Sequence, residues 1–126
     1  MFALAFSAAL VCTSAAAIDG DTIRCANLGR VRLLGIDAPE MAGHCRRGRD
    51  CAPGAPLASK RAMTRALGAS RITVEPIAHD RYNRVVGIVR AGRVNLSCAQ
   101  LRGGLAVYKP QWDNGRRIAK ECPDAQ

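Results

Sequence analysis

Six cysteines place the strongest constraint on this chain of 126 residues. They stand at positions 12, 25, 45, 51, 98 and 122. An even set of cysteines in so short a sequence is typical of a disulfide framework, which forms and persists in oxidising compartments. We therefore expect a secreted or periplasmic protein, although six cysteines by number alone allow fifteen connectivities.

The N-terminal stretch MFALAFSAALVCTSAAA supports export. It is apolar, rich in small residues and too short to span a bilayer, as in the apolar region of a secretory signal. It lacks the basic residues with which such a signal usually begins. Cleavage after Ala17 would leave five cysteines, whereas cleavage near Ala8 or Ala9 keeps all six. We predict a signal-peptide remnant over residues 1–9 and one domain over residues 10–126; the alternative is a buried first strand.

The stretch AIDGDTIRC suggests how the first cysteines pair. Asp-Gly at positions 19 and 20 is a strong hairpin signal, so the strand LVCTSAAAI would bring Cys12 beside Cys25. The remaining cysteines would then form two bridges, Cys45 with Cys51 and Cys98 with Cys122. A zinc site that includes His44 is the alternative, but Cys-x5-Cys with one histidine lacks the close ligand pairs of zinc sites.

The remaining sequence predicts alternating strands and helices. GRVRLLGIDAPE indicates a third strand that ends at Pro39, and PLASKRAMTRALG indicates a helix that stops at Gly68. Further strands are indicated by SRITVEPIA and NRVVGIVRAGRVNL. A second helix, capped by Asn95, is indicated by LSCAQLRGGLAVY. A long basic loop is indicated over residues 41–56. With antiparallel hairpins throughout, this order predicts an α+β, mainly β fold: a Greek-key barrel with packed helices, most commonly the oligonucleotide-binding (OB) fold.

The net charge of +9 favours a polyanionic partner such as nucleic acid or an acidic membrane surface. Aromatic residues make up only 4% of the chain, which is too few for a stacking platform of several rings, so phosphate contacts fit better than base contacts. The arginines at positions 46, 47 and 49 fit either a solvated surface or a phosphate-tracking segment.

Carboxylates gather in two predicted turns, at Asp19 and Asp21 and again at Asp37 and Glu40. In a barrel the two turns could meet, and carboxylates clustered in this way are costly unless a hard cation neutralises them. Arg32, Arg81 and Arg84 follow nearby, and arginine binds phosphate through a planar fork. Judged singly, each acid could equally be a turn former or a solvated side chain.

Three sequence motifs that contain these residues resemble those of a known protein family. IDGDTIR, VRLLGIDAPE and DRYNRVVG resemble those of the staphylococcal nuclease (thermonuclease) family, in the same order, and the similarity extends from about Ala15 to Tyr108. The resemblance implies a five-stranded OB-fold barrel with two to three packed helices. It also implies Ca²⁺-dependent hydrolysis of DNA or RNA phosphodiesters with little base specificity.

The resemblance also assigns residue roles. It implies Ca²⁺ ligands at Asp21, Asp37 and the carbonyl of Ala38, which stands where the family often has threonine. Catalytic roles fall on three residues: Glu40 as general base, and Arg32 and Arg84 as phosphate-binding arginines. Substrate contacts fall on Arg81, Tyr82 and Tyr108.

The chain departs from the family pattern in a cysteine-bearing loop over residues 43–53 and in a shortened last helix. We interpret the expected Cys98–Cys122 bridge as a substitute for the missing helix packing. The resulting hypothesis is a monomeric calcium-dependent nuclease without stable membrane association. Its rivals are a non-catalytic OB-fold module that binds nucleic acid or a modified peptide, and a basic membrane-active secreted protein.

Overall fold

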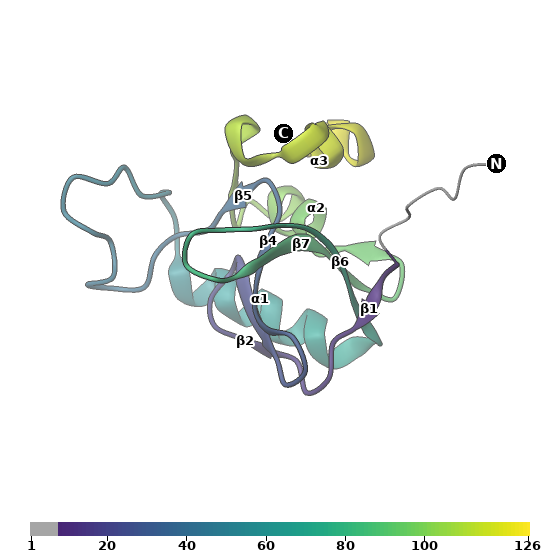
Figure 1. Cartoon of the computed structure of the whole chain (residues 1–126). Helices are drawn as coiled ribbons and strands as arrows, with labels where there is room; N and C mark the ends of the chain where they lie inside the picture. The colour runs from purple at the N-terminus through teal and green to yellow at the C-terminus, as the bar shows by residue number, and fades with distance from the viewer. Residues whose placement is uncertain (1–7) are drawn as a thin grey trace.

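The structure is a computed structural model that describes residues 8–126, so all but the last two residues of the predicted signal remnant lie outside the described part. Its centre is a curled sheet with the strand order β1-β6-β7-β4-β3-β2 (Figure 1). The strands are β1 (Leu10–Val11), β2 (Ala16–Ala17), β3 (Thr22–Cys25), β4 (Gly29–Leu33), β6 (Ile72–His79) and β7 (Val85–Ala91), and β8 (Val94–Asn95) pairs with β7. The predicted mainly β barrel is confirmed.

The N-terminal segment closes this sheet. β1 pairs with β6 at one end of the strand order, and β2 pairs with β3 at the other end. Because only residues 12–15 separate the two strands, the sheet must curl until its ends meet. The prediction of one strand over LVCTSAAAI is therefore wrong: the segment changes partners at Ser14, whose φ of 50° breaks the extended conformation.

All three predicted disulfides are confirmed. Cys12 is bonded to Cys25, and the other bridges are Cys45–Cys51 and Cys98–Cys122. The first bridge fastens the closing segment to β3, beside the predicted hairpin. Because every cysteine is bonded to another cysteine, the alternative of a zinc site is excluded.

The predicted third strand divides at Gly35, whose φ of +79° favours glycine. β4 ends at Leu33, and β5 (Ile36–Asp37) pairs with β9 (Val107–Tyr108) in a separate small sheet. The expectation of antiparallel pairing throughout is also wrong, because β4 and β7 are parallel. A sequence read as successive hairpins misses this pairing, since β4 and β7 are far apart along the chain.

Three α-helices pack on the barrel: α1 (Pro56–Ala69), α2 (Leu96–Arg102) and α3 (Arg117–Glu121). α1 matches its prediction but continues through Gly68. Asn95 caps α2 as expected, since its side chain accepts a hydrogen bond from the Cys98 amide at 3.2 Å. α2 ends earlier than predicted, before Gly103 and Gly104, and short 3-10 turns follow at Pro110–Trp112, Asn114–Arg116 and Pro123–Ala125.

The core lies between the curled sheet and the helices. Its fully buried side chains include Ile23, Val31, Leu33, Val74, Val89, Met63, Leu96 and Ile118. The basic loop after β5 stands outside this core, at the left of Figure 1. Within the described residues, no helix has the length and apolar character needed to cross a membrane.

The Cys98–Cys122 bridge joins α2 to the residue that follows α3, across 24 residues of sequence. α3 has only five residues, and two of them, Ile118 and Ala119, are buried against the core. The loop-entropy argument assigns about 3 kcal/mol to a bridge of this span. The bridge therefore fastens a helix that has little packing surface of its own.

We expect the Cys98→Ala/Cys122→Ala variant to lose about 3 kcal/mol of unfolding free energy, because the unfolded chain regains the conformations that the bridge removes. Chemical denaturation under non-reducing conditions would measure the loss. An unchanged denaturation midpoint would show that α3 holds its place without the disulfide.

Candidate active site

The turn between β2 and β3 is held tightly by the helices. A Cβ at Gly20 would lie 1.8 Å from the Ser59 hydroxyl oxygen on α1, so only glycine fits there. From α2, the Gln100 side-chain amide donates to the carbonyls of Gly20 and Ser59 at 2.9 and 3.1 Å. The Asp-Gly turn predicted from the sequence is thus a fixed support for the carboxylates that flank Gly20.

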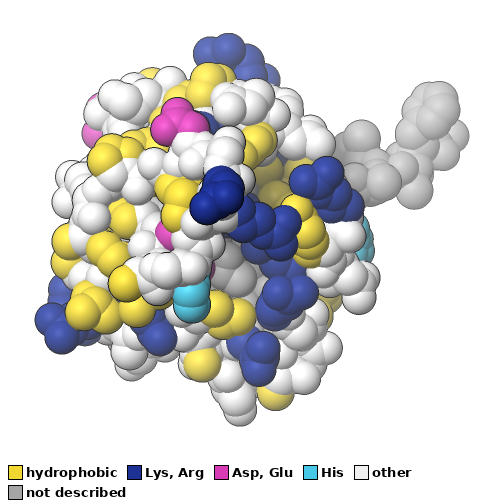
Figure 2. All heavy atoms as spheres, turned by 90° about the vertical axis from the view of Figure 1, so that its left-hand side faces the viewer, with side chains coloured by type: hydrophobic (Ala, Val, Ile, Leu, Met, Phe, Trp, Pro, Cys, Tyr) yellow, Lys and Arg dark blue, Asp and Glu magenta, His cyan; other side chains and the backbone are white. Residues whose placement is uncertain are grey.

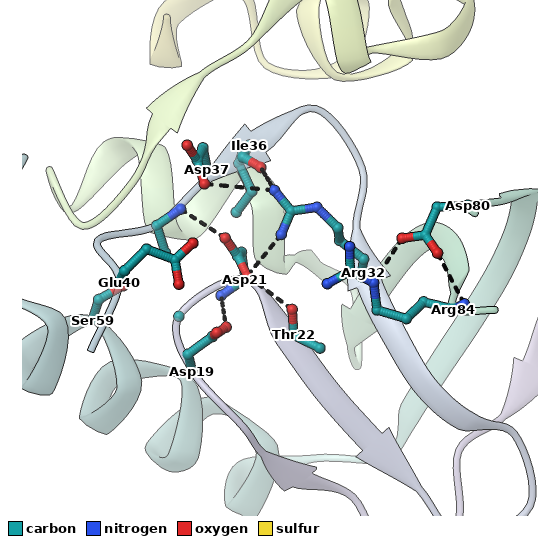
Figure 3. Close-up of polar contacts among 12 residues, drawn as sticks. Asp19, Asp21, Thr22, Arg32, Ile36, Asp37, Glu40, Ser59, Asp80 and Arg84 are labelled. Atoms are coloured by element: carbon teal, nitrogen blue, oxygen red, sulfur yellow. Dashed lines mark hydrogen bonds and ion pairs between the residues drawn. The ribbon is translucent and has the colours of Figure 1, made fainter. Parts of the chain in front are cut away.

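Asp21 is buried at the end of this turn, and both of its carboxylate oxygens have polar partners (Figure 3). Its Oδ1 accepts the Thr22 hydroxyl at 2.8 Å and lies 2.9 Å from Nη1 of Arg32. Its Oδ2 accepts the backbone amide of Ala38 at 2.8 Å. Asp21 therefore joins the first hairpin to the segment that follows β5, and the two acidic turns meet as predicted.

Asp37 shares Arg32 with Asp21. Nη2 of Arg32 lies 3.6 Å from Oδ1 of Asp37 and donates to the Ile36 carbonyl at 3.1 Å. Asp37 is only 1% exposed, and its Oδ2 is buried without a hydrogen-bond partner among the described residues. A buried, unpaired carboxylate oxygen is costly, which makes it a ready acceptor for a further positive group.

Glu40 lies at the edge of this cluster and contacts an arginine that the sequence analysis did not place in the site. Nη1 of Arg49 lies 2.6 Å from Oε1 of Glu40, and Nη2 of the same group lies 3.3 Å from Oδ1 of Asp37. The motif gave no signal for Arg49, because only the path of the long loop brings it back to the acids.

Arg84 is positioned by Asp80, a second residue that the sequence analysis missed. Nε of Arg84 lies 2.6 Å from Oδ2 of Asp80, and Oδ1 accepts the backbone amides of Tyr82 and Arg84 at 2.9 and 3.0 Å. An aspartate that accepts amides two residues on is typical of a turn, which was the available signal. Asp80 thereby fixes both the turn and the guanidinium of Arg84.

Three arginine side chains lie against the ring of Tyr82. The guanidinium carbons of Arg46, Arg81 and Arg84 lie 5.6, 5.1 and 5.3 Å from the centre of its ring. Its hydroxyl accepts a hydrogen bond from Arg81 at 3.0 Å. This aromatic side chain is 40% exposed, so the cluster presents positive charge to solvent.

These groups surround one open pocket, and Figure 2 shows Lys and Arg side chains gathered beside a hollow on this face. The pocket is lined by Asp19, Asp21, Arg32, Glu40, Arg49, Arg81, Tyr82, Arg84 and Trp112, among others. Tyr108, Asp37 and Ala38 are not among its lining residues, and the Tyr108 hydroxyl donates to the buried Asp113 at 2.7 Å. Trp112, 39% exposed, stands there with Arg32 at 5.0 Å from its ring centre.

Burial and neighbouring charges shift the pKa values of the three aspartates of the cluster in different directions. Burial, hydrogen bonding and the charge of Asp21 raise the pKa of Asp19 to about 7. Burial would also raise the pKa of Asp21, but the Arg32 charge and the hydrogen bonds outweigh it, so that pKa is lowered. The pKa of Asp37 is raised by burial and by the Asp21 charge, against the opposing arginines. The charged forms of Asp19 and Asp37 are therefore disfavoured, mainly by burial, whereas that of Asp21 is favoured.

The cluster fits a hard divalent cation in its donor chemistry. Asp21 and Asp37 supply carboxylate oxygens, the chain turns at Ala38 beside them, and the unpartnered Oδ2 of Asp37 is available. No three His, Cys, Asp or Glu side chains of residues 8–126 are gathered closely enough to define a metal site by themselves. Such a cation would therefore need a backbone carbonyl or water in addition.

The sequence matches a known family over most of its length. A family model described as staphylococcal nuclease homologue matches residues 30–126, which is well over half of the chain. The match includes Arg32, Asp37, Glu40 and Arg84, and it begins after the hairpin that carries Asp21. A comparison with curated proteins finds no significant match.

We expect Asp19→Asn to stabilise the metal-free protein at about pH 8 by about 1–2 kcal/mol, a value reduced for the partial exposure of Asp19. The carboxyl ionises near pH 3.8 when unfolded but near pH 7 when folded, so ionisation destabilises the native state as pH rises between these values. Denaturation at several pH values should show the difference vanishing below about pH 4. Asp50→Asn, on the exposed loop, controls for net charge, and an equal gain there would contradict the assignment.

Proposed function

The chain belongs to the staphylococcal nuclease homologue family, and from this premise we propose that it is a calcium-dependent nuclease. Its reaction would be hydrolysis of DNA or RNA phosphodiester bonds with little base specificity. One observation carries the proposal: Arg32 pairs with both Asp21 and Asp37, and Asp21, Arg32, Glu40 and Arg84 line one basic pocket. A protein that only bound nucleic acid would have no chemical need for buried carboxylates in that pocket.

Calcium would be held by the carboxylates of Asp21 and Asp37 and by the backbone carbonyl of Ala38. When bound, the ion would supply positive charge beside the reacting phosphate. Two features of this chain support the assignment: burial and the Asp21 charge raise the pKa of Asp37, so its charged form lacks full compensation, and Oδ2 of Asp37 has no partner among the described residues.

The other residues divide the hydrolysis between them. Glu40 would accept a proton from a water molecule as the water oxygen attacks phosphorus. The bond to the leaving oxygen would then break, and that oxygen would take up a proton from solvent. Arg32 and Arg84 would bind the non-bridging phosphate oxygens and stabilise the negative charge that develops on them, with Arg84 also assisting the leaving oxygen. Asp80 would hold Arg84 in position through the ion pair described above.

The nucleic-acid chain would lie across the arginine-rich face. Arg81 and Tyr82 are exposed, line the same pocket and would contact the nucleotide next to the scissile phosphate. Tyr108 is the weaker assignment, since its hydroxyl already binds Asp113. We propose that the protein acts as a monomer, without stable membrane association, in a secreted or periplasmic location that preserves its three disulfides.

We expect Glu40→Gln to lower the cleavage rate by about 10²- to 10⁴-fold, because the amide cannot accept the proton of water. Binding of a non-cleavable oligonucleotide should change little. Single-turnover cleavage and fluorescence anisotropy would measure the two effects separately. Glu75→Gln makes the same substitution on β6, outside the pocket, and is the matched control.

Two results would decide between the proposal and a binding-only module. Cleavage that stops with chelator and returns with calcium supports the nuclease. If the native protein bound oligonucleotides tightly yet cut none at any calcium concentration, a non-catalytic role would replace the one proposed here.

We expect Asp21→Asn to weaken calcium binding by at least about ten-fold, because site affinity depends on the number of charged ligands. Isothermal titration calorimetry would measure the change. Since the substitution also weakens a buried ion pair with Arg32, thermal denaturation must first show that the variant is folded at the titration temperature. A folded variant with native affinity would remove Asp21 from the ligand set.

A further inference from the structure

Arg49 occupies the side of the acidic cluster that faces the loop. Its guanidinium reaches Oε1 of Glu40 at 2.6 Å and Oδ1 of Asp37 at 3.3 Å, so one positive group spans both acids. The acids have different proposed tasks, one as calcium ligand and the other as general base. A cation that approached both carboxylates from this side would meet the guanidinium first.

Arg49 reaches the acids from a loop that lies outside the core. The loop after β5 is exposed, and Figure 1 shows it extending away from the barrel before it returns to α1. Within the loop, Cys45 is bonded to Cys51, and the Arg49 amide donates to the Arg46 carbonyl at 3.0 Å. The disulfide closes a short ring that contains Arg49, which limits how far the side chain can move from the acids.

The contact differs from an ordinary surface ion pair. Exposed pairs contribute about 0–1 kcal/mol because water solvates both partners. Here Asp37 is 1% exposed, and its Oδ1 is contacted by Arg32 as well as by Arg49. The Arg49 side chain is 37% exposed and has an open path to solvent, whereas Arg32, at 14%, is held inside the site. Arg49 is therefore the guanidinium that can leave.

We propose that Arg49 is a tethered counter-ion for Asp37 and Glu40, held in place by the Cys45–Cys51 bridge and displaced when a divalent cation binds. The inference rests on the calcium site of the proposed function. It has a quantitative consequence: while Arg49 occupies the acids, only a fraction of molecules can bind the cation, and the apparent affinity is reduced by that fraction.

Calcium titration of the full, oxidised chain by isothermal titration calorimetry tests this without any cleavage assay. We expect Arg49→Gln to bind calcium about five-fold or more tightly than the native protein, because its acids no longer have an internal competitor. Arg47→Gln removes the same charge from the same loop; Arg47 also lines the pocket, but it forms no ion pair with any residue of the described range 8–126. We expect that control to change the affinity less than about two-fold, since a solvated charge acts only at long range.

The Cys45→Ala/Cys51→Ala variant tests the tether. Opening the ring should tighten calcium binding part of the way toward the Arg49→Gln value, and adding Arg49→Gln to the open loop should give the affinity of Arg49→Gln alone. Native affinity in the open-loop variant would overturn the role of the bridge.

The outcomes separate this inference from the proposed function. If Arg49→Gln matches the native protein or the Arg47→Gln control while Asp21→Asn weakens binding, the calcium site stands and the counter-ion role is overturned. Calcium binding by Arg49→Gln but not by the native protein would support the inference in its strongest form. If no variant binds calcium, both the proposed calcium site and the role of Arg49 are overturned.

Discussion

The ion pair between Asp21 and Arg32 is the interaction on which the site and much of the barrel depend. Both groups are withdrawn from water, which is favourable only if each finds enough partners. Asp21 finds Thr22, Ala38 and Arg32, and Arg32 also donates to the Ile36 carbonyl. One pair of charges therefore joins β3, β4 and the segment after β5, so the fold and the reactive groups are built from the same contacts.

Closure of the sheet explains why these groups meet at one end of the barrel. The closing segment brings β2 beside β3, and the tight approach of Gly20 to Ser59 then presses the acidic turn against α1. The division at Gly35 turns the chain out of the curled sheet, so that β5 carries Asp37 toward the same place. The core supplies rigid supports, and the reactive side chains stand where regular strands end.

Arginine has more than one role around this pocket. Arg32 is a structural partner of Asp21 and a proposed phosphate ligand, and these roles are compatible only if another cation takes over part of the neutralisation. Arg84 is already held by Asp80, and its charge faces the Tyr82 cluster. The protein thus combines a strongly basic surface with a small acidic centre that its own arginines do not fully neutralise.

The sequence by itself determined the motifs, the Cys12–Cys25 and Cys45–Cys51 pairs, helix α1 and the cap at Asn95, because each depends on neighbouring residues or on a short hairpin. The Cys98–Cys122 pair, 24 residues apart, followed only as the one that remained. Only the tertiary structure decided the parallel pairing of β4 with β7, the split at Gly35 and the contact of Arg49 with Glu40. Turns and helices are indicated by residues that are adjacent in the sequence. Partners distant along the chain are selected by how the whole barrel packs, and no short stretch of sequence contains that information.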